Sequence, residues 1–250
     1  MGLVREDGAL DLYDGPIRAI DAAGNRVLDD VDVQDYLDYI AEDVRPWSYM
    51  KFPFLKSLGP EKGWYRVGPL SRLNVADFID SPEAEAARKD FFEAVGDGPC
   101  NVTMAYHWAR MIELLHSAEK IRELLDDDDI QGDELVTSGE RRREAAAVIE
   151  APRGTLFHHY RVDENDQIEM ANLIVATTNN NDAMNASVRK VARDYLSGTE
   201  ITEGLLNRVE VAIRAYDPCL SCATHALGQM PLRIDLYDAA GRHLDGKAKE

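Results

Sequence analysis

The sequence predicts an α+β fold, predominantly α, in which part of a helical bundle carries β-hairpins at its edges. Apolar residues recur at helical spacing over three long segments, near residues 102–125, 182–196 and 202–216. Two other segments, near residues 8–28 and 155–177, alternate apolar and polar residues around turn signals. That alternation is typical of β-hairpins.

The first third of the chain is expected to be mainly β and irregular. Leu10 and Leu12 alternate with polar or small neighbours before a Gly-Asn turn, which predicts strands over residues 8–28. Residues 32–40 fit a short amphipathic helix. Residues 45–70 contain four prolines and six aromatic residues, which indicates an irregular but packed segment.

The middle of the chain predicts helices. Ser81-Pro82 is a typical helix start, with serine as the N-cap and proline in the first turn. For the helix near residues 102–125 we expect His107 and His116 to be surface or satisfied core residues. Its predicted apolar face comprises Met104, Met111, Leu114, Leu115, Ala118, Ile121 and Leu125.

The last third predicts a hairpin, two helices and a final strand. The hairpin strands are expected at residues 156–162 and 168–177. The second helix, residues 202–216, ends where Pro218 cannot continue it, and a strand is expected at 232–236. The apolar stripe of that helix comprises Leu205, Leu206, Val209, Ala212, Ile213 and Tyr216.

Composition excludes some classes of function. The 250-residue chain carries a net charge of −18, from 46 acidic and 28 basic residues. A nucleic-acid-binding protein normally presents a basic surface, so that class is disfavoured. No apolar run approaches the roughly 18 residues of a membrane span, and the first residues lack the apolar stretch of a secretory signal. We expect a cytoplasmic protein with neither a nucleic-acid partner nor a membrane span.

The cysteines suggest a thiolate site. The chain has three, Cys100, Cys219 and Cys222, and an odd number with one close pair favours reduced thiols over a disulfide framework. Two cysteines separated by two residues can point both thiolates at one metal. Zinc sites, iron–sulfur clusters and redox dithiols all use this spacing. Spacing alone therefore leaves the kind of site open.

Three longer stretches narrow the choice. Residues 217–225 read Asp-Pro-Cys-Leu-Ser-Cys-Ala-Thr-His, and residues 150–160 read Glu-Ala-Pro-Arg-Gly-Thr-Leu-Phe-His-His-Tyr. Residues 171–181 read Ala-Asn-Leu-Ile-Val-Ala-Thr-Thr-Asn-Asn-Asn. These stretches resemble the carboxyl-terminal metal motif, the arginine loop and the strand after that loop in nickel–iron hydrogenase large subunits. Residues 49–54 and 65–74 further resemble the soluble, NAD-reducing bidirectional type.

The resemblance implies a nickel–iron centre with carbon monoxide and cyanide ligands on the iron. Cys219 is implied as a terminal nickel ligand and Cys222 as a bridge between the two metals. Soft thiolates suit both. His225 is implied to bind a magnesium or iron ion, to which the carbonyl of Leu173 contributes.

The same resemblance implies roles around that centre. Arg153 would lie over the open side of the metal pair, where its permanent charge stabilises the reaction. Asp217 would pair with Arg153 or orient it. The pocket for the cyanide ligands would be lined by Pro152, Ala176 and Thr177, with the threonine hydroxyl as a donor.

The resemblance also implies heterolytic cleavage or formation of dihydrogen within a larger complex. Electrons would pass through an iron–sulfur small subunit to NAD-linked diaphorase subunits. Residues 1–225 would form the hydrogenase-like part. Residues 226–250 would be an extension that a maturation endopeptidase removes, so the sequence reads as a precursor.

One departure from the family pattern matters for activity. The family's nickel takes two further thiolates from an amino-terminal Cys-x-x-Cys motif, which this sequence lacks. We therefore expect either a truncated reading frame or a separately encoded amino-terminal half, and no hydrogenase activity from this chain alone. The alternatives are a non-catalytic assembly or electron-transfer-complex subunit, and a zinc or dithiol Cys-x-x-Cys module.

Overall fold

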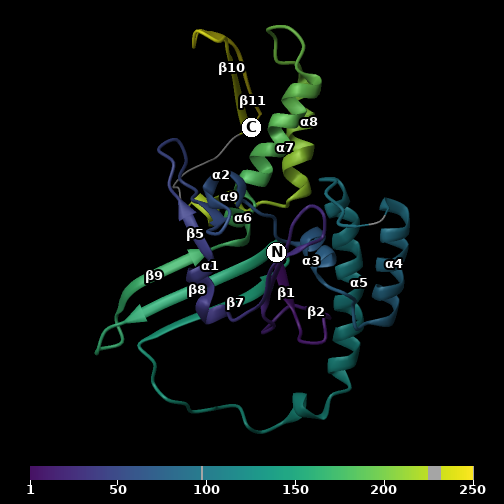
Figure 1. Cartoon of the computed structure of the whole chain (residues 1–250), viewed down its shortest axis with the longest axis vertical. Helices are drawn as coiled ribbons and strands as arrows, with labels where there is room; N and C mark the ends of the chain where they lie inside the picture. The colour runs from purple at the N-terminus through teal and green to yellow at the C-terminus, as the bar shows by residue number, and fades with distance from the viewer. Residues whose placement is uncertain (97, 225–231, 250) are drawn as a thin grey trace.

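The computed structural model describes residues 1–96, 98–224 and 232–249, and it confirms the α+β class (Figure 1). The three- and four-stranded sheets occupy the central and lower part of the molecule in this view, and the four long helices form two separate pairs beside and above them. The expectation of a predominantly helical bundle with peripheral hairpins gave the sheets too small a role. Residues predicted as isolated hairpins instead form sheets of three and four strands that contribute core residues.

The amino-terminal sheet has the strand order β2-β1-β3-β4. Its antiparallel pairs place Leu3 opposite Ile17, and both side chains are buried. This alternation matches the pattern that predicted strands here. The four strands are β1 (Gly2–Val4), β2 (Leu10–Asp11), β3 (Ile17–Ile20) and β4 (Arg26–Val31).

The second sheet is an antiparallel meander in the order β7-β8-β9. Its strands are β7 (Glu144–Ala151), β8 (Gly154–Val162) and β9 (Ile168–Ile174). The predicted hairpin corresponds to β8 and β9, and β7 was not anticipated. The predicted second strand was also too long, because residues 176–179 form the short helix α6 (Ala176–Asn179).

Two antiparallel helix pairs flank these sheets (Figure 1). One pair joins α4 (Pro82–Val95) to α5 (Ala105–Leu125). The other joins α7 (Asn181–Tyr195) to α8 (Glu203–Ala215), whose predicted apolar stripe is largely buried. The short helix α3 (Pro69–Val75) lies between α5 and the first sheet, and six of its seven residues are buried.

The remaining elements are short. A hairpin joins β5 to β6, and a second joins β10 to β11 where only one strand was predicted. Their bounds, with those of the other short helices, are η1 (Val33–Asp35), α1 (Tyr36–Tyr39), β5 (Ile40–Asp43), β6 (Phe52–Leu55), α2 (Gly59–Lys62), η2 (Asp128–Gln131), α9 (Leu220–Thr224), β10 (Leu232–Tyr237) and β11 (His243–Lys249).

The predicted apolar face of α5 is wrong. Met111, Leu114 and Ile121 are each 60% exposed, whereas Glu113 and His116 are buried. The helix turns its polar residues inward because each has a buried partner there. Glu113 pairs with Arg72, and the Nδ1 atom of His116 lies 2.8 Å from the Ser81 hydroxyl.

The helix start at Ser81 is confirmed in position but not in its bond. Ser81 has extended backbone before Pro82, yet its side chain makes no capping bond to the helix. The hydroxyl contacts His116 instead. His116 is therefore a satisfied core histidine, one of the two roles expected for it.

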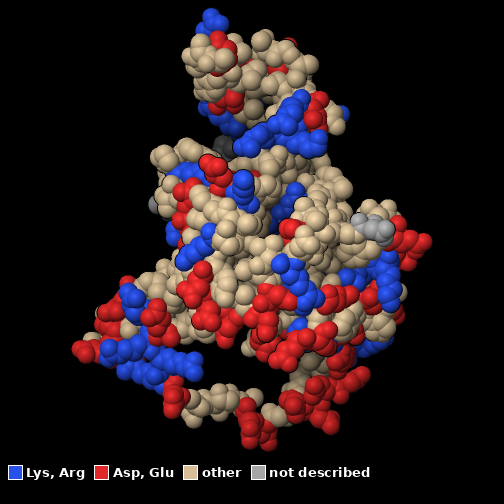
Figure 2. Space-filling view, viewed as in Figure 1, with Lys and Arg blue, Asp and Glu red and all other residues tan. Residues whose placement is uncertain are grey.

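Surface charge is unevenly distributed. Acidic side chains gather over the lower part of the face shown in Figure 2, where the connection between α5 and β7 runs. Residues 126–140 of this connection are exposed. Among the described residues, no helix has both the length and the apolar character needed to cross a membrane.

Candidate metal centre

The arginine turn, which we define as residues 151–154, joins β7 to β8. Ala151 pairs with Gly154 across the two strands, so Pro152 and Arg153 form the two-residue tip. Gly154 has a φ of 137°, a backbone region that favours glycine. The Glu-Ala-Pro-Arg-Gly stretch, expected as a loop that precedes a hairpin, is thus the end of β7 and a tight turn.

A second glycine packs against this turn. A Cβ on Gly68 would lie 2.7 Å from the carbonyl oxygen of Arg153, and one on Gly154 would lie 2.3 Å from a methyl carbon of Val67. Real Cβ atoms do not approach other atoms so closely. The two backbones therefore meet because neither residue has a side chain.

Beneath the turn, the guanidinium of Arg72 is buried and fully bonded. It donates to both carboxylate oxygens of Glu113, at 2.6 Å each, and to Glu150 at 2.6 Å. It also donates to the carbonyls of Ala151 at 2.9 Å and Pro152 at 3.3 Å. Glu150 in turn accepts bonds from the Thr155 hydroxyl and from the backbone of β1.

This cluster is strongly coupled electrostatically. Burial alone lowers the pKa of Arg72, but Glu113 and Glu150 outweigh that effect and raise it. Burial raises the pKa of the Glu150 carboxyl, and Arg72 and Thr155 oppose that rise. Removing one partner would leave an uncompensated buried charge, which typically costs about 3–5 kcal/mol of stability.

The cysteine segment, which we define as residues 217–224, follows α8. Asp217 has a φ of 49°, in the left-handed region that lets the chain leave the helix sharply. Cys219 and Cys222 then bracket the start of α9 with their Cα atoms 5.3 Å apart. Their sulfur atoms are joined as a disulfide, whereas the sequence led us to expect thiols. Metal binding requires the reduced dithiol.

Thr177 on α6 holds the cysteine segment. Its buried hydroxyl oxygen accepts a bond from the backbone N–H of Cys219 at 3.0 Å. Two buried asparagines on the same stretch then anchor α6 to other parts of the chain. Asn179 donates to the carbonyl of Thr155, and Asn180 bonds both backbone groups of Val67.

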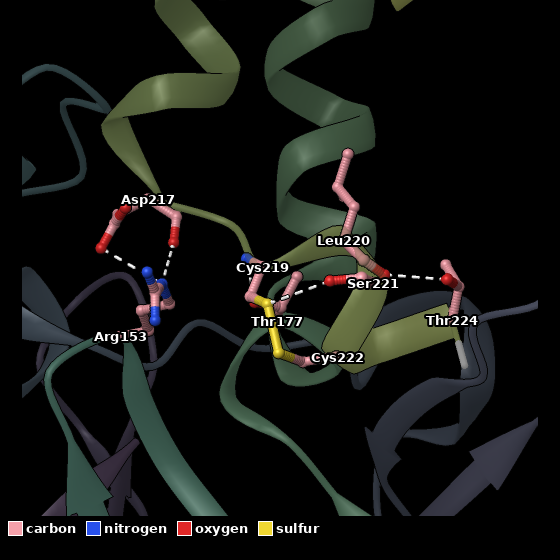
Figure 3. Close-up of a disulfide and its surroundings, with 8 residues drawn as sticks. All are labelled: Arg153, Thr177, Asp217, Cys219, Leu220, Ser221, Cys222 and Thr224. Carbon is pink, nitrogen blue, oxygen red and sulfur yellow. Dashed lines mark hydrogen bonds and ion pairs between the residues drawn. A yellow bond between two sulfur atoms is a disulfide. The ribbon is translucent and has the colours of Figure 1, made fainter. Parts of the chain in front are cut away.

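The arginine turn and the cysteine segment meet through Arg153. Its Nε donates to the carbonyl of Asp217 at 2.6 Å and lies 3.2 Å from the carboxylate. Arg153 and Asp217 lie to one side of Cys219, and Cys222 lies to the other (Figure 3). The Arg153 side chain is 44% exposed, so its fixed charge borders open space beside the sulfurs.

These residues fit one half of a thiolate-bound metal centre. Two soft sulfur donors lie close enough to share one centre, beside a permanent positive charge. Cys100 is buried elsewhere, and its backbone bonds Asn74. No group of three or more His, Cys, Asp and Glu residues among the described residues could enclose a metal. A four-thiolate site therefore needs donors beyond those that this part of the chain brings together.

The other predicted site residues are dispersed around this junction. Pro152 is exposed at the tip of the turn, and Ala176 is buried at the start of α6 beside Thr177. Leu173 lies on β9, paired with His158. His225 lies outside the described residues.

Sequence reasoning missed the residues that support the turn. Arg72 falls within residues 65–74, which carry part of the family resemblance, but it was given no role, and Glu113 was not considered. One signal was available, namely a lone arginine among the apolar residues of α3. An arginine buried in such a helix requires carboxylate or carbonyl partners.

Comparisons with known proteins identify a family for the chain. The family model described as nickel-dependent hydrogenase matches residues 4–225. The NAD-reducing hydrogenase HoxS subunit beta of Cupriavidus necator is 52% identical, over 100% of this chain and 52% of its own length. An F420-non-reducing hydrogenase subunit of Methanothermobacter marburgensis is 46% identical, over 96% of this chain and 51% of its own length.

A solved structure extends the similarity to three dimensions. The crystal structure of an NAD+-reducing [NiFe]-hydrogenase in the H2-reduced state matches with a TM-score of 0.85 and 52% identity. That match covers 90% of this chain and 50% of the other. The chain thus spans about half the length of the relatives it matches.

Proposed function

Because this chain belongs to the nickel-dependent hydrogenase family, we propose that it supplies one half of a nickel–iron site for the heterolytic cleavage or formation of dihydrogen. The observation that carries the proposal is the convergence of Cys219, Cys222 and Arg153 at one junction. A dithiol beside a fixed positive charge suits a metal pair whose ligands carry negative charge.

Cys219 would hold nickel as a terminal ligand, and Cys222 would bridge nickel and iron. The carbon monoxide and cyanide ligands of the iron would lie against Pro152, Ala176 and Thr177. The Thr177 oxygen accepts from Cys219 N–H, so its own hydrogen stays available for donation to a cyanide. When bound, the metal pair supplies a Lewis-acidic centre that polarises dihydrogen.

Residues around the metals would accept the released proton and stabilise the charge that develops. In the reduced, metal-bound form the Cys219 thiolate would be a basic atom at the centre, and Arg153 would place its charge where negative charge develops. Arginine is a poor proton acceptor because its guanidinium group is not deprotonated in proteins, so electrostatic stabilisation is the favoured role. Asp217 would hold the Arg153 head in place through its carbonyl and carboxylate.

The complete enzyme would need partners. The chain spans about half of its relatives, so an amino-terminal half of the large subunit would supply the other thiolates. Electrons would pass first to an iron–sulfur small subunit and then to NAD-linked diaphorase subunits, which would reduce NAD. A magnesium or iron ion would bind His225 with the Leu173 carbonyl, and a maturation endopeptidase would remove residues 226–250.

The test compares the purified chain with the chain co-produced with the partner subunits and maturation proteins of a related enzyme. We expect hydrogen-dependent dye reduction, with nickel and iron bound together, only in the assembled complex. Turnover by the chain alone would contradict the proposal that it supplies only half of the metal site. An assembled complex that contains neither metal would contradict the function.

The disulfide supports a second candidate function, a dithiol redox pair at Cys219 and Cys222. In that case two electrons and two protons would convert the disulfide into two thiols. A reduction potential near about −270 mV with rapid thiol exchange would favour this function. Slow exchange together with nickel uptake after reduction would favour the metal site.

A further inference from the structure

All the hydrogen-bond donors of Arg72 are used on two segments that are distant from it in the sequence, namely α5 and the end of β7 with the turn after it. A guanidinium carries five N–H groups, and the five hydrogen bonds of Arg72 use all of them. Three go to the carboxylates of Glu113 and Glu150, and two go to the carbonyls of Ala151 and Pro152. The Arg72 side chain is only 1% exposed, so no water replaces any of these partners.

The two carbonyl bonds distinguish this cluster from an ordinary buried ion pair. Charge balance needs only carboxylates, yet Arg72 also binds the two consecutive peptide groups before Arg153. Fixing two successive carbonyls fixes the orientation of the peptide plane that leads into the next residue. The direction in which Arg153 leaves the turn therefore depends on Arg72.

The same helix also contacts the far end of the turn. Gly68, the N-cap of α3, approaches the carbonyl of Arg153 and the backbone of Gly154. Helix α3 thus contacts the turn from both sides, with Arg72 on residues 151–152 and Gly68 on residues 153–154. Glu113 on α5 holds the guanidinium itself in place through two bonds of equal length.

We propose that Arg72 is a positioning residue, which fixes the arginine turn so that the head of Arg153 reaches Asp217 beside the cysteine pair. The effect of Arg72 on catalysis rests on the proposed function. The effect of Arg72 on the orientation of Arg153 rests only on the hydrogen bonds described above. Lysine cannot replace arginine here, because three donors on a point charge cannot serve four acceptor groups arranged around a plane.

Arg18 provides a matched control. It is also buried, and it bonds Asp29, Asp77 and the carbonyl of Val75. None of these partners belongs to the arginine turn. Arg18→Met therefore removes a buried arginine and its ion pairs without touching residues 151–154.

The experiment measures amide hydrogen exchange across the full chain for wild type, Arg72→Lys, Arg72→Met and Arg18→Met. We expect exchange at residues 151–155 to accelerate at least about tenfold in both Arg72 variants, beyond any change in global stability. The Nε–H signal of Arg153 should lose its protection in the same variants. In Arg18→Met, residues 151–155 should follow the global change only.

Two outcomes would overturn the proposal. One is exchange at residues 151–155 that rises no more in Arg72→Lys than in Arg18→Met. The other is a protected Arg153 Nε–H in a folded Arg72 variant. If Arg72→Met does not fold, Arg72→Lys decides, since it keeps the charge.

The exchange measurement needs no metal. A wild-type complex that lacks hydrogenase activity would contradict the proposed function and leave the exchange result standing. In an active complex, Arg72→Lys should lower turnover more than it lowers the nickel content. Rescue of turnover by lysine would contradict the need for a planar fork.

Discussion

The two arms of the candidate metal centre are supported very differently. The arginine turn rests on a buried guanidinium with five bonds and on two glycines in close contact. The cysteine segment is half-buried or exposed at Cys219 and Cys222. Its polar contacts with the two neighbouring elements are the Thr177 bond to Cys219 and the Arg153 contacts with Asp217.

This difference shows that contacts between described residues fix the arginine turn more firmly than they fix the cysteine segment. The turn is fixed by charges and carbonyls, so its geometry needs no metal. Among the contacts between described residues, fewer hold the cysteine segment, and a metal bound to two thiolates would restrain it directly. The arginine turn is thus preorganised, whereas under the proposed function the cysteine segment would be completed on metal binding.

The largest effect is expected from a change in the cysteine segment. Replacing Cys219 by serine exchanges a soft thiolate for a weakly acidic hydroxyl, which binds nickel poorly. In the assembled complex we expect loss of bound nickel and a fall in dye-reduction rate of at least about 100-fold, the upper range for losing even an indirect metal partner. The arginine turn should keep its hydrogen-exchange protection.

Cys100→Ala is the control for this substitution, because Cys100 is a buried cysteine away from the pair. It should change thermal stability but not nickel content. If Cys219→Ser kept wild-type turnover, the proposal that the cysteine segment binds the metals would be wrong.

The sequence predicted the two arms unequally, for physical reasons. Cysteine spacing and family resemblance are local features, so they located the cysteine segment and the arginine turn. The support of the turn comes from Arg72 and Glu113, which are 41 residues apart. Sequence separation of that size hides a pairing that only the fold brings together.

The same limitation explains the error on α5. Periodicity assumes that the apolar face is the buried one, and on α8 that assumption worked. On α5 the buried face instead carries Glu113 and His116, because Arg72 and Ser81 satisfy them. The pattern in one helix contains no information on partners supplied by another.

A smaller effect on turnover should follow from a change in the arginine turn. Arg153→Lys keeps the charge but loses the planar head that contacts both the carbonyl and the carboxylate of Asp217. We expect turnover in the assembled complex to fall about 10- to 100-fold, less than the roughly 100- to 1,000-fold cost of removing an electrostatic donor, because lysine keeps the positive charge. Nickel content should stay close to wild type, because the side chain is no ligand.

Arg161→Lys is the matched control for this change. Arg161 lies on β8, the strand that begins directly after Arg153, with a similar exposed fraction of 47% and an ion pair to Glu169. Its substitution should leave turnover unchanged. An equal loss in both variants would show that Arg153 acts through general surface charge and has no specific place at the junction.

The smallest effect should come from the bond between α6 and the cysteine segment. Thr177→Val keeps the shape of a buried side chain but removes the oxygen that accepts from Cys219 N–H. A neutral hydrogen bond contributes about 1 kcal/mol, so we expect roughly a fivefold loss of turnover or of nickel affinity. Thr178→Val, at an equally buried threonine of α6, is the control. If Thr178→Val has the same effect as Thr177→Val, packing of α6 explains the loss. If only Thr177→Val weakens nickel binding, the Thr177 hydroxyl contributes to the metal site beyond the packing of α6.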